Sequence, residues 1–512
     1  MPISLGSPEL IKLNTLIEEN IRVGRDQPPI YVDVSNNLSR ILAKQNHVVF
    51  GRRGSGKSTL LLSAKAQVEN KGSLCIYFDS ELIKENPYPD ILISILVEVF
   101  KYLSKHSASM EQGIFRHFRR IVPSRKSQLN NRVKRAIESL ENLRTEPQVY
   151  DKKTETTRTR GKGAVATVGI GLDKTEISGR FAQTGISTVK EAAETTVVKI
   201  ARLQQNLELY HNLIVEILDE FKQDEFKQSM MLFLDDFYFI ARQNQPDVID
   251  YLHRLCKGTN MFLKIGTIKY RTRLYNISPR NGKTIGVELD NDIFPIDLDY
   301  TLEDLAAMST FLDHILHTFA ERVNVQVDEL DTLFTTGGKK LLHMASGGVP
   351  RDFLNLFLRS QNIAKKRMVQ KLEKQRAVGE AARQYLNDVK KQNFSEDSIG
   401  DSVPLEELID RIRRFAIDDK RKTVILVDQE ETGKHPEEYD RLKQLMDLRF
   451  VHLVDSNTSA TYGGRKRYEG YMLDVGLWAS PRIPSLVEVD FAKRDASGRK
   501  DELRNCPKFR LA

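Results

Sequence analysis

The residues best suited to chemistry lie in the stretch HVVFGRRGSGKSTLLL, at 47 to 62. Four residues of strand character run into the pattern G-x-x-x-x-G-K-S, and an apolar helical pattern follows. Glycines in this arrangement let the backbone turn tightly, so that successive N–H groups point at a phosphate from a helix N-terminus. The lysine bridges the β- and γ-phosphate oxygens of a nucleotide, and the serine hydroxyl is a ligand for Mg²⁺. The predicted phosphate-binding loop consists of Gly51, Gly54, Ser55, Gly56, Lys57, Ser58 and Thr59.

A phosphate-binding loop needs an acidic partner, and the run MMLFLDDF at 230 to 237 supplies one. Its five apolar residues are typical of a buried strand, and ligands of open α/β sheets bind at the carboxyl edge, where the two aspartates lie. We expect Asp235 to hold Mg²⁺ through water and Asp236 to orient or deprotonate the attacking water. The alternative is that the two carboxylates cap the next helix, but the loop requires such a group somewhere.

A third buried strand is predicted at 261 to 267, MFLKIGT. It ends in Thr267, whose hydroxyl reaches the γ-phosphate or the attacking water in this interpretation. Arginines follow the strand, and they are candidates to contact the γ-phosphate of a neighbouring subunit, as arginine fingers do. These candidates are Arg271, Arg273 and Arg280. The sequence does not choose among them, and an ordinary surface arginine is the alternative for each.

With three such strands in this order, the chain resembles the AAA+ and STAND ATPases, and more specifically the origin-recognition initiator clade of AAA+ proteins. The resemblance rests on GRRGSGKS (51 to 58), LFLDDF (232 to 237), KIGT (264 to 267) and SGGVPRDFLNLF (346 to 357). The last motif is similar to the sensor-2 motif of a helical lid, which implies that Arg351 reaches the γ-phosphate and reports hydrolysis. The resemblance spans roughly residues 30 to 395 and implies an ATPase that uses ATP and Mg²⁺.

Two features depart from the initiator pattern. Initiator-type proteins usually carry Asp-Glu in the second motif, whereas Asp235-Asp236 is more similar to the STAND signalling ATPases. Aspartate has a shorter reach as a base, so slow or switch-like turnover is expected. In addition, Asp235 lies 178 positions after Lys57, although a βαβ unit takes roughly 30 residues or more. Even with a strand predicted at 74 to 79 and a helix near 88 to 105, about a hundred residues remain between the two motifs. We therefore predict an insertion at 106 to 203.

The basic charge of the chain is concentrated in this insertion. The 512 residues carry 78 Lys and Arg against 70 Asp and Glu, a net charge of +8. Residues 101 to 190 hold 19 Lys and Arg against 8 Asp and Glu, a local net charge of +11, which leaves −3 for the rest. Clustered basic charge binds nucleic acid, but a solvated helical insertion is an equally favoured interpretation. The candidate contacts are Arg116, Arg119, Arg120, Arg125 and Lys126.

Small and β-branched residues alternate at 163 to 185, around Leu172-Asp173-Lys174-Thr175. This pattern predicts a Gly-rich β-hairpin. A finger that meets a partner or a second subunit and an insertion without a role are equally favoured interpretations.

Helical patterns dominate residues 302 to 392 and predict a lid that closes over the nucleotide. Because Arg351 follows Pro350 at the start of a helix, we expect the position of the lid to be coupled to phosphate occupancy. Beyond 394 to 402 the predicted order is helix, strand, helix, strand, strand, with the last strand at 468 to 479, and this order is that of a winged helix. Its expected wing tip carries basic residues that are candidates for phosphate contacts, with a protein-docking module as the alternative. They are Arg465, Lys466 and Arg467.

The predicted fold is therefore an α/β P-loop NTPase of AAA+ type, with a parallel sheet, a helical lid, a large basic insertion and a C-terminal winged helix. The expected segments are a helical segment at 1–29, the ATPase core at 30–300, the lid at 301–395, the winged helix at 403–485 and a tail at 486–512.

Composition excludes several other classes of protein. Three cysteines that lie far apart exclude a disulfide framework and a cysteine-based zinc site. The ten histidines lack ligand spacing, so we expect no metal beyond the Mg²⁺ of the nucleotide. The longest apolar stretch, at 91 to 100, is too short to span a bilayer, so we expect a cytoplasmic protein with no membrane partner.

The favoured function is a Mg²⁺-dependent ATPase of initiator-like type, a homo-oligomer that couples its nucleotide state to assembly on duplex DNA or with a partner. The alternative is a STAND-like regulatory ATPase of a prokaryotic anti-phage defence system, which gates an effector protein carried on another chain.

Overall fold

The computed structural model describes residues 3–22, 30–109, 125–145, 181–221, 229–277, 284–392, 394, 402–459, 466–479, 486–490 and 501–511. The chain divides into two compact units. The first comprises Met1–Leu82, Asp224–His253 and Asn260–Ala512, and the second comprises Ile83–Gln223 and Arg254–Thr259. Among the residues described, no helix combines the length and the apolar character that crossing a membrane requires.

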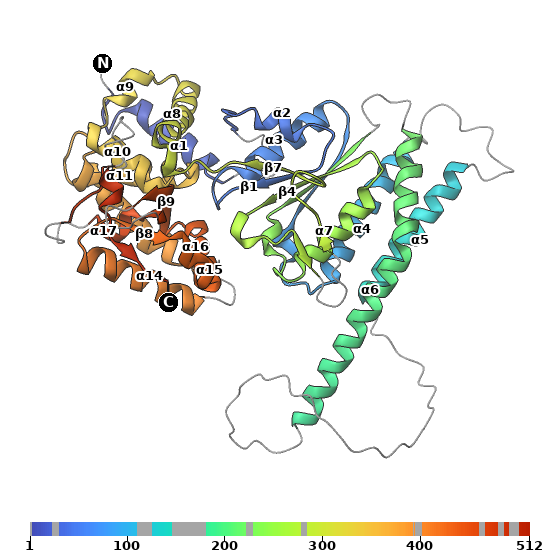
Figure 1. Ribbon diagram of the computed structural model, residues 1–512. Helices are drawn as coiled ribbons and strands as arrows, with labels where there is room; N and C mark the ends of the chain where they lie inside the picture. The colour runs from blue at the N-terminus through green and yellow to red at the C-terminus, as the bar shows by residue number, and fades with distance from the viewer. Residues whose placement is uncertain are drawn as a thin grey trace, which may run out of the picture. The chain divides into compact units, whose positions relative to one another are not determined.

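The first unit contains a five-stranded parallel sheet (Figure 1). In spatial order its strands are β2 Leu74–Asp79, β3 Met230–Asp235, β4 Met261–Thr267, β1 His47–Phe50 and β7 Phe294–Asp297. Each neighbouring pair is parallel. β1 and β3 are buried along their whole length, as expected for apolar strands covered on both faces. The predicted parallel α/β sheet is confirmed, and its carboxyl ends share one edge.

Three helices accompany this sheet among the described residues: α2 Asn37–Ile41, α3 Lys57–Asn70, which follows β1, and α7 Gln245–Cys256. Two short antiparallel strands, β5 Tyr275–Ile277 and β6 Thr284–Gly286, pair separately from it. The apolar residues of α3 pack on the sheet, where Leu60 and Leu61 join Val49 and Phe233 in one buried cluster. This packing fixes the start of α3 at the carboxyl edge of the sheet.

The lid is helical, as predicted. Its helices are α8 Leu305–Arg322, α9 Val327–Asp331, α10 Thr336–Ser346, α11 Pro350–Lys366 and α12 Glu380–Tyr385. The N-terminal helix α1 Pro8–Asn20 also packs here, because its buried face belongs to the same core cluster as α8 and α11. The side-chain amides of Asn14 and Gln361 form two hydrogen bonds of 2.9 and 3.0 Å, which fix α1 against α11.

The C-terminal domain has the order of a winged helix, as predicted. Its elements are α14 Ser402–Arg413, β8 Val424–Asp428, α15 Gln429–Lys434, α16 Pro436–Asp447, β9 Val451–Ser459 and β10 Arg467–Leu473. Two details differ from the sequence-based prediction. The last predicted strand stops early, because the Asp474 side chain caps the short helix α17 Val475–Trp478. In addition, β11 Lys508–Phe509, in the tail, pairs in parallel with β8.

The described residues of the second unit include the helices α4 Asp90–Ser109, α5 Arg125–Thr145 and α6 Phe181–Glu220. Buried aromatic rings and ion pairs join them, such as Phe100 with Tyr210 at 5.4 Å between centroids and Lys199 with Asp90 at 2.6 Å. Residues 163 to 180 of the predicted hairpin lie outside the described residues. For residues 181 to 185 the predicted hairpin is wrong. Residues 181 to 185 begin α6, because apolar residues recur at helical spacing from Ile186 onward.

Candidate nucleotide-binding site

The loop between β1 and α3 has the backbone that a phosphate cradle requires. Gly54 and Gly56 have φ angles of 91° and 100°, which side chains rarely tolerate. A Cβ atom on Gly51 would lie 2.2 Å from the Ser55 Oγ atom, so the turn closes only around a glycine. The first N–H groups of α3 are left without helical partners and face this turn. The predicted loop therefore has the conformation of an anion-binding site.

Lys57 is the first residue of α3, and its side chain folds back over the loop. Its Nζ atom donates to the carbonyl oxygens of Gly51 at 3.0 Å and Arg52 at 3.3 Å. Although the side chain is buried, these partners are neutral. The positive charge of Lys57 therefore adds to that of the helix N-terminus at the phosphate position.

A cavity of about 360 Å³ opens over the loop. The loop residues 53 to 59 line it, Ser55, Ser58 and Thr59 among them. Apolar residues from other segments also line it: Ile21, Ile30, Val32, Phe311, Ile315, Phe319 and Leu354. A cavity lined both by a phosphate-binding loop and by apolar side chains has the chemistry that the phosphates and the flat ring of a nucleotide require.

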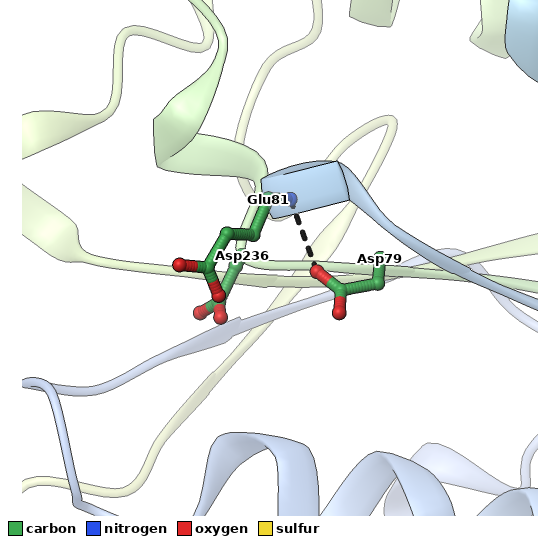
Figure 2. A group of neighbouring side chains, drawn as sticks. All are labelled: Asp79, Glu81 and Asp236. Atoms are coloured by element: carbon green, nitrogen blue, oxygen red, sulfur yellow. Dashed lines mark hydrogen bonds between the residues drawn. The ribbon is translucent and has the colours of Figure 1, made fainter. Parts of the chain in front are cut away.

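Three carboxylates gather at the carboxyl edge of β2 and β3 (Figure 2). Asp79, Glu81 and Asp236 each offer an oxygen atom within 4.8 Å of the others. The Asp79 Oδ1 atom also accepts a hydrogen bond of 3.0 Å from the Glu81 backbone N–H, which fixes the turn after β2. Ser58 lines the same cavity as Glu81 and Asp236. Carboxylate and hydroxyl oxygens are the hard ligands that Mg²⁺ prefers, so the residues present fit this ion.

Asp236 combines burial with negative neighbours. Burial first and the Asp235 carboxylate second raise the pKa of Asp236 to about 7, and Lys57 opposes this shift. Its backbone lies in the left-handed region, with φ of 50°, and its side chain lines the cavity together with Glu81. A carboxylate with such a pKa is suited to accept a proton near neutral pH.

Asp235 lies deeper than Asp236. It is 2% exposed, and its two oxygen atoms accept hydrogen bonds from the Tyr77 hydroxyl at 2.6 Å and from the Asp236 backbone N–H at 2.8 Å. A Cβ atom on Gly266 would lie 2.6 Å from the Asp235 Oδ1 atom, so the glycine makes room for the carboxylate. The role expected for Asp235, holding Mg²⁺ through water, stays a prediction.

Arg351 approaches the loop from the lid. It lies in the first turn of α11, and its backbone N–H donates to the Gly54 carbonyl oxygen at 3.3 Å. The side chain lines the cavity, and among the described residues it has no hydrogen-bond or ion-pair partner. Burial first, and Arg449 second, lower the pKa of Arg351, whereas Asp352 raises it. A cation in these surroundings is available to an anionic ligand.

The remaining candidates are Thr267, at the end of the third predicted strand, and the arginines that follow it. The Thr267 hydroxyl is buried at the end of β4 and lies 2.5 Å from the Thr272 hydroxyl. The Arg271 guanidinium stacks over the ring of Tyr238, 4.9 Å from its centroid, and Arg273 is exposed. Arg280 lies outside the described residues. The roles predicted for these residues stay predictions.

The nucleic-acid candidates fall into three groups. Arg116, Arg119, Arg120 and Arg465 lie outside the described residues, and so do the side chains of Arg125 and Lys126 at the start of α5. Lys466 is held by carboxylates, with its Nζ atom 2.6 Å from Asp428 and 3.3 Å from Glu430. Arg467 is exposed at the start of β10.

The sequence-based prediction missed Asp79 and Glu81. The strand at 74 to 79 was predicted, and a polar residue at its carboxyl end is the signal that marks the other site residues. The two residues were missed because the sequence does not show that β2 pairs with β3, in a register that places Asp79 opposite Asp235.

No family model matches the chain, and no curated protein matches its sequence. Among solved structures it is similar to the Aeropyrum pernix ORC1 protein in complex with DNA, at 13% identity over 93% of this chain and 91% of that one, with a TM-score of 0.30. It is also similar to Drosophila ORC bound to DNA, at 9% identity over 94% and 92%, with a TM-score of 0.35. A Walker-type ATPase of Pyrococcus abyssi matches at 13% identity over 91% and 98%, with a TM-score of 0.40. Identities and TM-scores this low carry no inference about activity, which the residues of the site have to supply.

Proposed function

We propose that this chain binds ATP with Mg²⁺ and hydrolyses it to ADP and phosphate. One observation carries the proposal: cations for phosphate and carboxylates for a metal ion and a proton converge on a single cavity. Lys57 and Arg351 supply the cations, and Glu81 and Asp236 supply the carboxylates. The apolar residues that line the same cavity would contact the adenine ring.

Each group of residues in the cavity has a separate role in the proposed reaction. The loop N–H groups and Lys57 hold the β- and γ-phosphates, and Arg351 neutralises charge on the γ-phosphate. Asp236 accepts a proton from water as the water oxygen bonds to the γ-phosphorus and the bond to the β–γ bridging oxygen breaks. When bound, Mg²⁺ would supply further neutralisation of phosphate charge, and Ser58 with Asp79 and Glu81 would hold it.

The test is Lys57→Ala, with Lys65→Ala as the matched control. Both lysines lie on α3, but Lys65 pairs with Glu69 at 2.7 Å on the exposed face. We expect Lys57→Ala to lose binding of a fluorescent ATP analogue by about 100-fold or more, since a buried cation at the phosphates is removed. The control is expected to bind normally. Normal ATP hydrolysis by Lys57→Ala would overturn the site assignment.

We further propose that the nucleotide state controls assembly of a homo-oligomer on duplex DNA. The basic composition of residues 101 to 190 and the exposed Arg467 support this proposal. Binding of duplex DNA is measured over a range of salt concentrations, for the wild type and for a variant with residues 115 to 135 neutralised. An unchanged affinity and salt slope in the variant would exclude the insertion as the DNA contact.

The STAND-like alternative, a switch that gates an effector protein on another chain, has one structural observation in its favour. The helix α16 of the winged helix contacts the ATPase core through Asp440 and Asp447, so the helix is engaged within the chain. Duplex binding that is stimulated by ATP favours the first function. ATP hydrolysis without any duplex binding favours the second.

A further inference from the structure

Helix α16 is the second helix of the α15–α16 pair, the position that enters the major groove in helix-turn-helix proteins. Here it faces the ATPase core instead. Arg242 and Asp440 form an ion pair of 3.0 Å, and the Asp447 carboxylate accepts a hydrogen bond of 3.1 Å from the Tyr270 backbone N–H. The helix carries four acidic residues against two basic ones, a balance that phosphate repels. Its described contacts therefore serve the chain itself.

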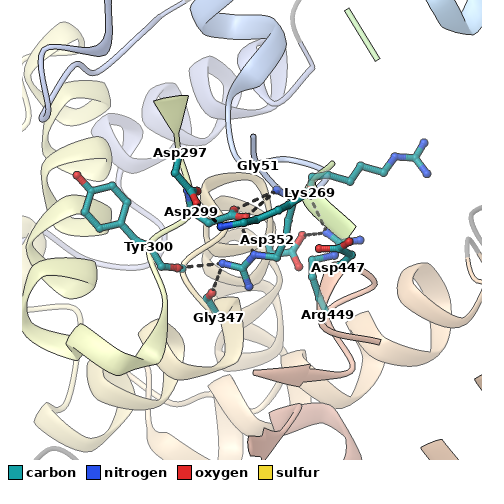
Figure 3. Close-up of polar contacts among 12 residues, drawn as sticks. Gly51, Lys269, Asp297, Asp299, Tyr300, Gly347, Asp352, Asp447 and Arg449 are labelled. Atoms are coloured by element: carbon teal, nitrogen blue, oxygen red, sulfur yellow. Dashed lines mark hydrogen bonds and ion pairs between the residues drawn. The ribbon is translucent and has the colours of Figure 1, made fainter. Parts of the chain in front are cut away.

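Arg449, just beyond α16, extends this interface to the nucleotide site (Figure 3). One of its guanidinium nitrogens, Nη1, donates to the Asp352 carboxylate at 2.6 Å and to the Arg53 carbonyl oxygen at 3.4 Å. Arg53 belongs to the phosphate-binding loop, and Asp352 follows Arg351 in the first turn of α11. A single side chain of the C-terminal domain therefore contacts both the phosphate-binding loop and the first turn of α11.

The ion pair between Arg449 and Asp352 is buried, so a change in its geometry is unfavourable. Asp352 is fully buried and Arg449 nearly so. The Tyr385 hydroxyl donates to the same carboxylate at 2.9 Å, and the Lys390 ammonium lies 3.7 Å from its other oxygen atom. Without Arg449 the buried carboxylate would keep only this longer ion pair, which is unfavourable. The first turn of α11 is therefore held where Arg449 holds Asp352.

A second set of contacts ties the domain to the same loop. The Arg52 guanidinium donates to the Asp299 carboxylate at 3.2 Å and to the Gly347 carbonyl oxygen at 2.8 Å. His452 of the C-terminal domain packs on Gly347, where an added Cβ atom would lie 2.2 Å from the ring. The loop, the turn before α11 and the C-terminal domain are thus in direct contact (Figure 3).

We propose that Arg449 is a positioning residue for Arg351, so that docking of the C-terminal domain and binding of the γ-phosphate are coupled. The inference rests on the proposed function, because it assigns the γ-phosphate to Arg351. Coupling of this kind is reciprocal: a docked domain strengthens ATP binding, and bound ATP strengthens docking. ADP lacks the γ-phosphate and takes no part in it.

Arg449→Lys is the test, and Arg242→Lys is its matched control. Lysine keeps the charge, but its side chain ends one bond short of the position of Nη1 and so does not reach the Asp352 and Arg53 oxygen atoms together. Arg242 joins the same two domains, but its ion pair with Asp440 is half-exposed and does not line the cavity. The measured quantities are the dissociation constants of a non-hydrolysable ATP analogue and of ADP.

We expect Arg449→Lys to weaken binding of the ATP analogue by about tenfold and to leave ADP binding unchanged. The control is expected to change neither. Combined with Arg351→Ala, the Arg449→Lys substitution should have no further effect on the analogue, because one acts through the other. A loss of equal size for both nucleotides, or no loss, would overturn the proposal, since a merely structural role does not distinguish ATP from ADP.

A measurement on the unmodified protein covers the case in which Arg449→Lys does not fold. Hydrogen exchange of the α16 amides is compared with the ATP analogue and with ADP bound. Slower exchange with the analogue supports the coupling, and equal exchange overturns it. If the wild type binds neither nucleotide, the proposed function itself fails.

Discussion

The basic side chains of the nucleotide cavity and those of the wing differ in what surrounds them. Lys57 contacts only neutral carbonyl oxygens among its hydrogen-bond acceptors, and the Arg351 guanidinium has no partner among the described residues. In the wing, Lys466 contacts the carboxylates of Asp428 and Glu430. Basic residues in a sequence therefore predict an anion site only where no carboxylate already neutralises them.

The strongest test of this difference is Arg351→Ala, with Arg467→Ala in the wing as its counterpart. Loss of a cation at the γ-phosphate is expected to lower kcat for ATP hydrolysis by about 100- to 1,000-fold. Arg467→Ala is expected to leave kcat unchanged. Steady-state ATPase assays measure both. An unaltered kcat in Arg351→Ala would remove the sensor-2 role from this residue.

Glycines give the second test. Gly54→Ala places a side chain at φ of 91° and sets its Cβ 2.8 Å from that of Arg351, so we expect a loss of about 1 to 3 kcal/mol in stability and weaker ATP binding. Gly433, in α15, has open space around it. Gly433→Ala is expected to leave ATP binding unchanged and to stabilise the fold by up to about 1 kcal/mol. Chemical unfolding and nucleotide titration compare the pair, and equal effects would contradict the close contact of loop and lid.

The third test uses pH. With the pKa of Asp236 raised to about 7 by burial and by Asp235, the base form is a minority at pH 6 and a majority at pH 8. The hydrolysis rate at saturating ATP should rise about tenfold between these values. A flat rate profile would exclude Asp236 as the base.

The same shift affects stability. Because the folded-state pKa of Asp236 lies above the ordinary value of 3.8, the folded protein holds the proton more tightly. The cost of its charge grows as the pH rises from about 4 to about 7 and is complete above that range. Asp236→Asn should therefore raise the unfolding temperature of the nucleotide-free protein more at pH 8 than at pH 5. An equal change at both pH values would argue against the raised pKa.

The smallest expected effect is in the wing. Because Asp428 and Glu430 already neutralise Lys466, we expect Lys466→Ala to leave the salt dependence of duplex binding unchanged. Arg467→Ala should lower the salt slope by about one, the value for one phosphate contact. Fluorescence anisotropy over a salt series measures both slopes. A larger change for Lys466→Ala than for Arg467→Ala would reverse the comparison of the two residues.

The sequence predicted four of the five strands of the sheet, because these four are apolar runs with polar residues at their carboxyl ends, and it missed the short strand β7. β1, β2 and β4 have the predicted bounds. The site residues that lie in one continuous segment, such as the phosphate-binding loop, were predicted. Glu81 was missed, because only the pairing of β2 with β3 brings it close to Asp236. Arg449 gave no signal, because its role depends on docking between domains.

The hydrogen bonds between Asn14 and Gln361 join residues 347 positions apart. At translation speeds of about 5 to 20 residues per second, roughly 17 to 70 s pass between synthesis of the two. During this time α1 has no lid to cover Leu10, Leu13 and Ile17, which are fully buried in the folded protein. The nascent chain therefore exposes these apolar side chains for most of its synthesis, and early binding by a chaperone would protect them from aggregation.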